Sequence, residues 1–235
     1  MVTIAAQFNG PDRTGNGGYV AGMLAAERSA TATTTSTLRV PPPLDVPLSW
    51  EHDGDAVRLL TAGGAIVGDA KPGTFAREPP PCPSPDQALA GLGVYPGFHH
   101  HPFDHCFTCG TQRDEGDGLR LFTGPIGDGL TAAPWTPHKA FADEDGAIAM
   151  PVMWAALDCP GGWAADFTVN TIVLGRMTAE VSRRPSSGEP CLSVGRLHAQ
   201  DGRKFLTDTA LYAESGELLG RAEQTWLQID LANFA

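Results

Sequence analysis

One acidic residue stands out in an otherwise apolar stretch of the sequence. Asp158 lies in Val152 to Ala165, which we expect to form a helix that is buried nearly all round, broken near Pro160. A carboxylate in such surroundings is costly unless it is used or paired. It could act as a general base or a nucleophile, or it could simply cap a helix end or pair with an arginine. Trp154, from the same segment, is a candidate substrate contact.

A second group of residues suits polarisation of a carbonyl group. Asn16-Gly17-Gly18 opens a small-residue apolar segment, Gly18 to Arg28, that we also expect to be a buried helix. The first turn of a helix has free amide groups and a partial positive charge, and glycine allows a ligand to approach closely. Gly18 and Gly17 could therefore bind a carbonyl oxygen, or they could serve helix packing alone. Asn16 is a good helix N-cap, with a substrate contact as a secondary role.

The five cysteines raise the question of a metal. Cys106 and Cys109, close to the histidines of residues 99–105, make a possible zinc half-site. No second Cys-x-x-Cys or His-x-x-x-His completes it, so we predict a buried cysteine pair, no metal and no cofactor. Cys159 could be a nucleophile, but no histidine lies at a suggestive position. An odd cysteine count without an export signal favours a reducing, cytoplasmic location.

Composition narrows the function classes. The chain has 235 residues, a net charge of −11 and no Lys/Arg run longer than two, which argues against binding to nucleic acid or an anionic membrane. No apolar run approaches the ~20 residues of a membrane span. The 28 glycines and 20 prolines indicate many turns and strand ends, and hence a β-rich or α+β protein.

A proline-rich stretch, Lys71 to His101, divides the chain into two halves that resemble each other. Each half has one apolar helix, then a strand, then two prolines at the same offset: Pro42 and Pro47 in the first half, Pro185 and Pro190 in the second. Hairpin turns follow at Asp53-Gly54, Gly63-Gly64, Asp201-Gly202 and Ser215-Gly216. The predicted boundaries are 1–75 for a short first unit, 76–104 for the linker and 105–235 for the second unit.

These features resemble the hot-dog thioesterase superfamily in its tandem, double hot-dog form. Asn16-Gly17-Gly18 looks like the family's His-Gly-Gly helix start, and Cys106-Phe107-Thr108-Cys109-Gly110 looks like the segment that precedes many such domains. The resemblance implies an α+β fold in which each antiparallel sheet wraps around a central helix and the two sheets pair edge to edge. It leaves open whether the chain is a monomer or a homodimer.

The resemblance also suggests where a reaction could take place. Family members carry a carboxylate nine residues after the histidine, but that position is Ala25 in the first half, and the helix start in the second half reads Ala149-Met150-Pro151. We infer one composite site that pairs Asn16-Gly17-Gly18 of one half with Asp158 of the other. The opposite pair would then be inactive.

The implied function is hydrolysis of an acyl thioester of coenzyme A or acyl carrier protein. Arg183 and Arg184 could hold coenzyme A phosphates, or they could form a solvated charge pair. Two other functions stay open: an acyl-ligand binding protein without catalysis, and a hot-dog hydratase or dehydratase. A hydratase would need an Asp/Glu–His pair, and no histidine falls near either helix.

Overall fold

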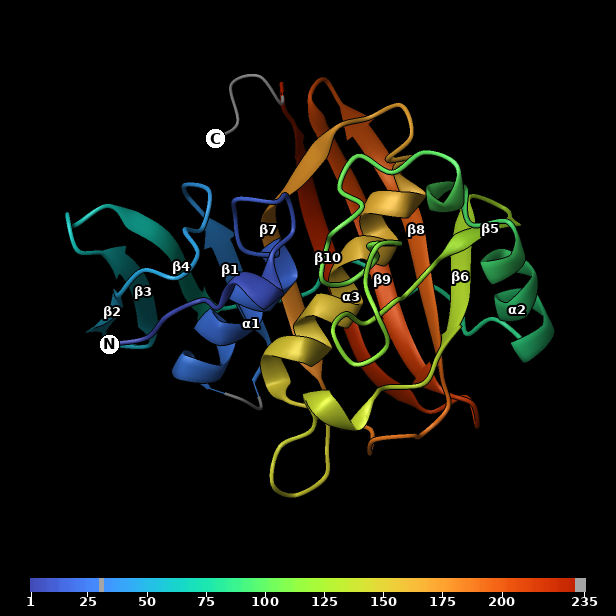
Figure 1. Cartoon of the computed structure of the whole chain (residues 1–235), viewed down its shortest axis with the longest axis horizontal. Helices are drawn as coiled ribbons and strands as arrows, with labels where there is room; N and C mark the ends of the chain where they lie inside the picture. Colours follow the sequence, from blue (N-terminus) through green and yellow to red (C-terminus); the bar gives the residue numbers. More distant parts are fainter. Residues whose placement is uncertain (30–31, 231–235) are drawn as a thin grey trace.

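In the residues that the structure describes, ten antiparallel strands form one continuous sheet, and three helices pack on it (Figure 1). The structure is a computed structural model that describes residues 1–29 and 32–230; the last five residues of the predicted second unit lie outside the described residues. The helices are α1 (Gly17–Arg28), α2 (Pro85–Gly93) and α3 (Met150–Ala164). The strands are β1 (Thr34–Leu38), β2 (Leu48–Asp53), β3 (Ala56–Thr61), β4 (Ile66–Pro72), β5 (Gly124–Gly127), β6 (Leu130–Trp135), β7 (Ile172–Val181), β8 (Cys191–Asp201), β9 (Lys204–Ala213) and β10 (Leu218–Gln228).

The strand order joins the two halves of the chain into that single sheet. The order is β2-β3-β4-β1-β7-β10-β9-β8-β6-β5, so the first four strands form one end and the last six form the other. The junction is the antiparallel pair β1–β7, in register from Thr34 opposite Ala179 to Thr37 opposite Arg176. The hydroxyls of Thr35 and Thr178 are hydrogen-bonded across it at 2.7 Å. The predicted edge-to-edge pairing and α+β fold are confirmed.

The two predicted buried helices, α1 and α3, pack directly against each other on the sheet (Figure 1). Small residues make the close approach possible. A Cβ added at Gly22 would lie 2.7 Å from the Cα of Pro151, and one added at Gly18 would lie 2.8 Å from the carbonyl oxygen of Trp154. Gly18 therefore lies opposite Asp158, whereas Gly22, one turn further along α1, lies opposite Pro151 and Trp154, which come earlier in α3. The two helices therefore run antiparallel.

The expected break at Pro160 is wrong, because α3 is continuous from Met150 to Ala164. A proline inside a helix leaves a carbonyl without its usual amide donor. Here side chains of the sheet reach the carbonyls of this part of α3. The hydroxyl of Thr209 donates to the carbonyl of Leu157 at 2.6 Å, and Nε2 of Gln224 donates to the carbonyls of Leu157 and Asp158 at 2.8 and 2.9 Å. The carbonyl that lacks its donor is that of Ala156, four residues before Pro160, and the two carbonyls that follow it are bonded to the sheet, which holds this part of α3 in place.

The segment expected to be a linker contains a helix, α2. Ser84 caps it in a reciprocal arrangement: the Gln87 amide donates to the Ser84 side chain, and the Gln87 side chain accepts from the Ser84 amide. Pro85 occupies the first turn, where its missing N–H costs nothing. Helix α2 packs on β5 and β6, so part of residues 76–104 belongs to the packed structure.

The predicted hairpin turns are confirmed. Gly54, Gly64, Gly202 and Gly216 all have positive φ angles, which a turn of this kind requires and glycine adopts without strain. They join β2 to β3, β3 to β4, β8 to β9, and β9 to β10. Among the described residues, no helix has the length and apolar character needed to cross a membrane.

Candidate functional site

A cavity of about 190 Å³ lies where the start of α1 meets the middle of α3. Residues from both halves of the chain line it. The first half contributes residues 14–17 and 38–42, and the second contributes Asp158 with strands β7 and β10. Much of the wall is apolar and aromatic: Leu38, Phe103, Phe167, Ile172, Leu174, Trp226 and Leu227. Such a wall suits an apolar group of a ligand.

Asp158 is buried in the wall of this cavity, with 2% of its surface exposed. Its Oδ2 accepts a hydrogen bond of 2.8 Å from the Gly18 amide, so the carboxyl group lies at the N-terminus of α1. Its Oδ1 is buried and has no hydrogen-bond partner among the described residues. The side chain is therefore held by one oxygen and leaves the other available.

Burial raises the pKa of Asp158 well above its usual value. The hydrogen bond from the Gly18 amide opposes this, because it stabilises the ionised form. The neighbouring Cys106 raises the same pKa further when its thiol is ionised. A carboxyl group with a raised pKa is a stronger base once it has lost its proton.

The residues at the start of α1 have separate tasks. Asn16 caps the helix as predicted, because its Oδ1 accepts from the Tyr19 amide at 2.8 Å. Its Nδ2 donates to the Cys106 sulfur at 3.6 Å and to the Thr108 hydroxyl at 3.4 Å. Gly17 lines the cavity, whereas Gly18 packs against α3 and uses its amide to hold Asp158.

Three of the proposed substrate contacts are not brought to the cavity. Trp154 is buried between α3 and α1, against Gly22, and does not line the cavity. It is a core residue because its ring fills the space that the small residues of α1 leave.

Arg183 and Arg184 are also absent from the cavity wall. Arg183 pairs with Glu189 at 2.7 Å and with Glu217 at 2.8 Å, and Arg184 pairs with Asp143 and Asp145. The sequence pattern of two arginines before a proline could not reveal these acidic partners, which lie up to 41 residues away along the chain. The alternative of a surface charge pair describes them better than a phosphate site.

The opposite helix ends do not match the Gly18–Asp158 arrangement. Ala149 is the N-cap of α3 and makes no side-chain cap hydrogen bond, and Pro151 lies in the first turn without an amide proton. Ala25 is buried in the core against the second half. None of these three residues lines the cavity described above.

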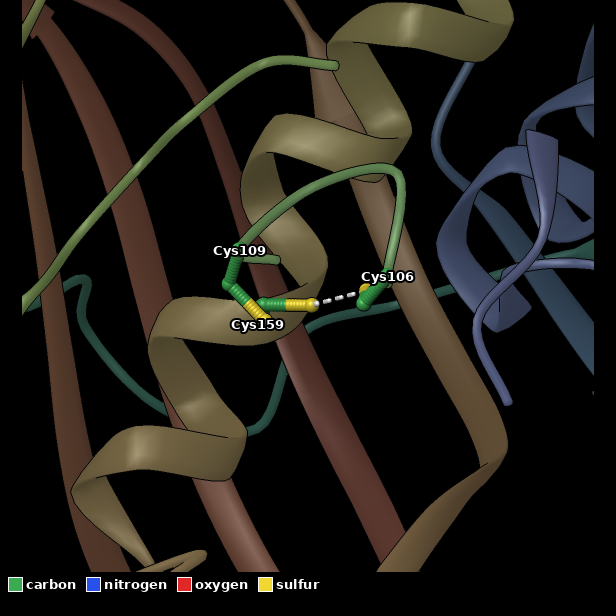
Figure 2. Close-up of side chains that lie close together, drawn as sticks. All are labelled: Cys106, Cys109 and Cys159. Carbon is green, nitrogen blue, oxygen red and sulfur yellow. Dashed lines mark hydrogen bonds between the residues drawn. The ribbon is translucent and has the colours of Figure 1, made fainter. Parts of the chain in front are cut away.

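The structure brings a third cysteine to the pair noted in the sequence. Cys106 and Cys109 lie on a loop over α3, and Cys159 projects from α3 toward them (Figure 2). All three sulfurs lie within 4.8 Å of one another. No pattern in the sequence indicates this grouping, because Cys159 is 50 residues from Cys109 and no spacing rule relates them.

Comparisons with known proteins agree on the fold. No family model matches the sequence, and no curated protein matches it. Among solved structures, the chain is similar to acyl-CoA thioesterase II TesB2 from Mycobacterium marinum, with 15% identity, a TM-score of 0.58, and coverage of 91% of this chain and 88% of that one. It is also similar to the tesB protein of Mycobacterium avium subs paratuberculosis, with 13% identity, a TM-score of 0.57, and coverage of 94% and 89%. The chain therefore has the double hot-dog fold that its sequence predicted.

Proposed function

We propose that this protein hydrolyses an acyl thioester of the coenzyme A type in the cavity between α1 and α3. The observation that carries the proposal is the position of Asp158: a buried carboxyl group from one half of the chain, bonded to the first turn of the helix from the other half. The fold, shared with an acyl-CoA thioesterase at low identity, supports the same class of reaction.

The chemistry divides between the two helices. The first amides of α1, at Gly17 and Gly18, would donate hydrogen bonds to the thioester carbonyl oxygen and stabilise the negative charge that develops on it. In the free protein the Gly18 amide is bonded to Asp158, so the carbonyl must compete for this donor. Asn16 caps the same turn and keeps these amides in place.

Asp158 would supply the base or the nucleophile. As a base, it takes a proton from water, and the resulting hydroxide adds to the carbonyl carbon. The tetrahedral intermediate then collapses, the carbon–sulfur bond breaks, and the thiolate leaves and takes up the proton. As a nucleophile, the carboxylate adds directly and water releases the acyl group in a second step. The apolar wall would hold the acyl chain, while the carrier stays outside.

Two observations weigh on the alternatives. A hydratase would require a histidine at the reacting centre, and no histidine of the described residues lines the cavity. An acyl-binding protein without catalysis would bind the same ligands and leave the thioester intact. The carboxyl group at the helix terminus favours hydrolysis, since a ligand-binding wall alone does not need it.

The test is a panel of acyl-CoA thioesters of increasing chain length, with the intact thioester followed by chromatography. Hydrolysis by the wild-type chain of at least one member, over the spontaneous rate, supports the proposal. Tight binding of panel members without hydrolysis would contradict it and support the binding function instead.

A further inference from the structure

The three buried cysteines beside the cavity form a cluster that the proposed hydrolysis does not use. We refer to Cys106, Cys109 and Cys159 as the cysteine cluster. The Cys106 and Cys159 sulfurs are 3.7 Å apart, and the third sulfur lies within 4.8 Å of both (Figure 2). Two sulfurs bound to one tetrahedral zinc ion at about 2.3 Å would be about 3.8 Å apart. The observed spacing therefore needs little adjustment to hold one cation.

The loop that carries two of the sulfurs is fixed by several hydrogen bonds. The Gly110 amide donates to the Cys106 carbonyl at 2.8 Å, and a Cβ at Gly110 would lie 2.6 Å from that oxygen, so the turn requires glycine. The Thr108 hydroxyl donates to the carbonyl of Ala155 in α3 at 3.2 Å, which pins the loop to the helix that carries Cys159. The Tyr95 hydroxyl donates to the Cys109 carbonyl at 2.9 Å. The three sulfurs are thus positioned before any ligand binds.

One hydrogen bond from outside the cluster reaches its sulfurs. Asn16 Nδ2 donates toward the Cys106 sulfur, and such outer hydrogen bonds stabilise and orient a metal-binding group. Cysteine sulfur binds metals as the thiolate, and soft thiolate ligands select zinc, copper(I) and related ions. Three buried negative charges without a cation would be costly, whereas a cation makes the arrangement favourable.

The cavity gives access and one further coordination position. All three cluster residues line the cavity, together with Asp158, whose buried Oδ1 has no partner among the described residues. His101 is the nearby imidazole, but its Nδ1 accepts from the Phe103 amide at 2.9 Å and its Nε2 lies 3.0 Å from the Cys109 carbonyl. Both ring nitrogens are engaged, so the ligand set is three sulfurs.

We propose that the cysteine cluster binds one thiophilic d¹⁰ cation, Zn²⁺ being the representative ion, through three thiolates with the fourth position toward the cavity. The expectation of no metal assumed a half-site of two cysteines. The fold changes that premise by adding Cys159 from α3. Binding releases the thiol protons to the solvent, so that each thiol becomes a thiolate ligand without any change in oxidation state.

The test uses the full chain. The protein is reduced, its metal is removed with a chelator, and the chelator is then removed. Zn²⁺ is titrated in competition with a chromogenic chelator, and Cd²⁺ is titrated separately with ultraviolet detection of its thiolate charge-transfer band. We expect one equivalent per chain for each ion and a Cd²⁺ band of the size that three thiolates give. The Cd²⁺ measurement needs no variant, so it stands even where a substitution prevents folding.

Variants then locate the site. Loss of an outer hydrogen-bond partner weakens metal binding by about 10–100-fold. Loss of a ligand should cost more, so Cys106→Ser, Cys109→Ser and Cys159→Ser should each weaken Zn²⁺ binding by a larger factor. Cys82→Ser and Cys191→Ser are the matched controls, since both residues lie outside the cluster, and should leave affinity unchanged. The proposal would be overturned if the wild-type chain did not bind one equivalent of Zn²⁺, or if the three cluster variants bound Zn²⁺ as tightly as the wild-type chain. A disulfide within the cluster in place of a metal would also overturn it. None of these readouts depends on thioester hydrolysis.

Discussion

At the scale of single residues, Asp158 combines features that packing alone does not require. It is buried, its pKa is raised by that burial, and only one of its two oxygens has a partner. A buried carboxyl group with an unpaired oxygen lowers the free energy of unfolding, so its presence in the core costs stability. Its importance as a candidate could be inferred from the sequence because a lone acid in an apolar helix is conspicuous, and the structure places it at the cavity and at the start of α1. The placement of Arg183 and Arg184 could not be predicted, since Glu217 and Asp143, which pair with them, are 34 and 41 residues away in the sequence.

Arg183 provides a prediction at this scale. The Arg183 guanidinium lowers the pKa of Glu189, so the ion pair contributes stability at neutral pH that is lost as the pH falls through the lowered pKa of Glu189. Arg183→Gln should remove this acid-dependent part of the unfolding free energy, by at most about 1 kcal/mol because both side chains are partly exposed. Urea unfolding at pH 7 and in mild acid measures it.

The same variant separates the ion-pair role from a substrate role. Because Arg183 does not line the cavity, Arg183→Gln should leave the KM for an acyl-CoA substrate unchanged. A several-fold rise in KM, with the unfolding free energy unaffected at both pH values, would show that Arg183 contacts the substrate.

At the scale of elements, the contact between α1 and α3 determines where the site lies. The absence of side chains at Gly18 and Gly22 lets the helices approach closely, and this approach brings the Gly18 amide to Asp158. Both helices could be predicted from their all-round apolar character. The continuity of α3 through Pro160 could not be predicted, because a proline usually ends or kinks a helix and the sequence does not show that Thr209 and Gln224 of the sheet bond to α3 there. Helix α2 had a local signal, the Ser84–Gln87 capping pair, that the surrounding prolines masked.

Gly22 tests the helix contact without touching the proposed site. Gly22→Ala would place a methyl group 2.7 Å from the Pro151 Cα and from the Trp154 Cβ, neither of which can move freely. We expect it to lower the unfolding free energy by about 1–3 kcal/mol, as overpacking of a core does. Denaturant unfolding is the measurement.

Gly93→Ala in α2 is the matched control, because nothing lies within 4 Å of a Cβ at that position. It should be neutral or stabilising by up to about 1 kcal/mol, since alanine is the better helix former. Equal effects of the two substitutions would show that the α1–α3 contact is looser than described.

At the scale of the whole molecule, the ten-stranded sheet places two unequal halves side by side across β1 and β7. The resemblance to tandem hot-dog proteins implied this arrangement, and the repeat and the hairpins supported it. The cysteine cluster could not be predicted, because it forms only when the loop of residues 106–109 folds onto α3.

The two helix pairings are also unequal: one joins Gly18 to Asp158, and the other has Pro151 and Ala25 in the corresponding places.

This asymmetry predicts one productive site per chain. Titration with a non-hydrolysable thioether analogue of the best substrate, followed by calorimetry, should give one ligand per chain. Ala25→Asp should not create a second site, because Pro151 removes an amide donor at the opposite helix start. Two equivalent sites per chain would show that the wrong helix ends have been paired.

The most direct test of the account is the turnover of Asp158→Asn on the best acyl-CoA substrate, measured beside its affinity for the thioether analogue. Asparagine keeps the shape of the side chain and an acceptor for the Gly18 amide, but it cannot accept a proton as a base or attack as a carboxylate. If Asp158 is the base or the nucleophile, kcat should fall by about 100-fold or more while the affinity for the analogue stays nearly unchanged. Asp128→Asn, in the turn between β5 and β6, is the control and should keep full activity. Near wild-type kcat in Asp158→Asn, with the protein folded and the analogue bound, would contradict the central claim.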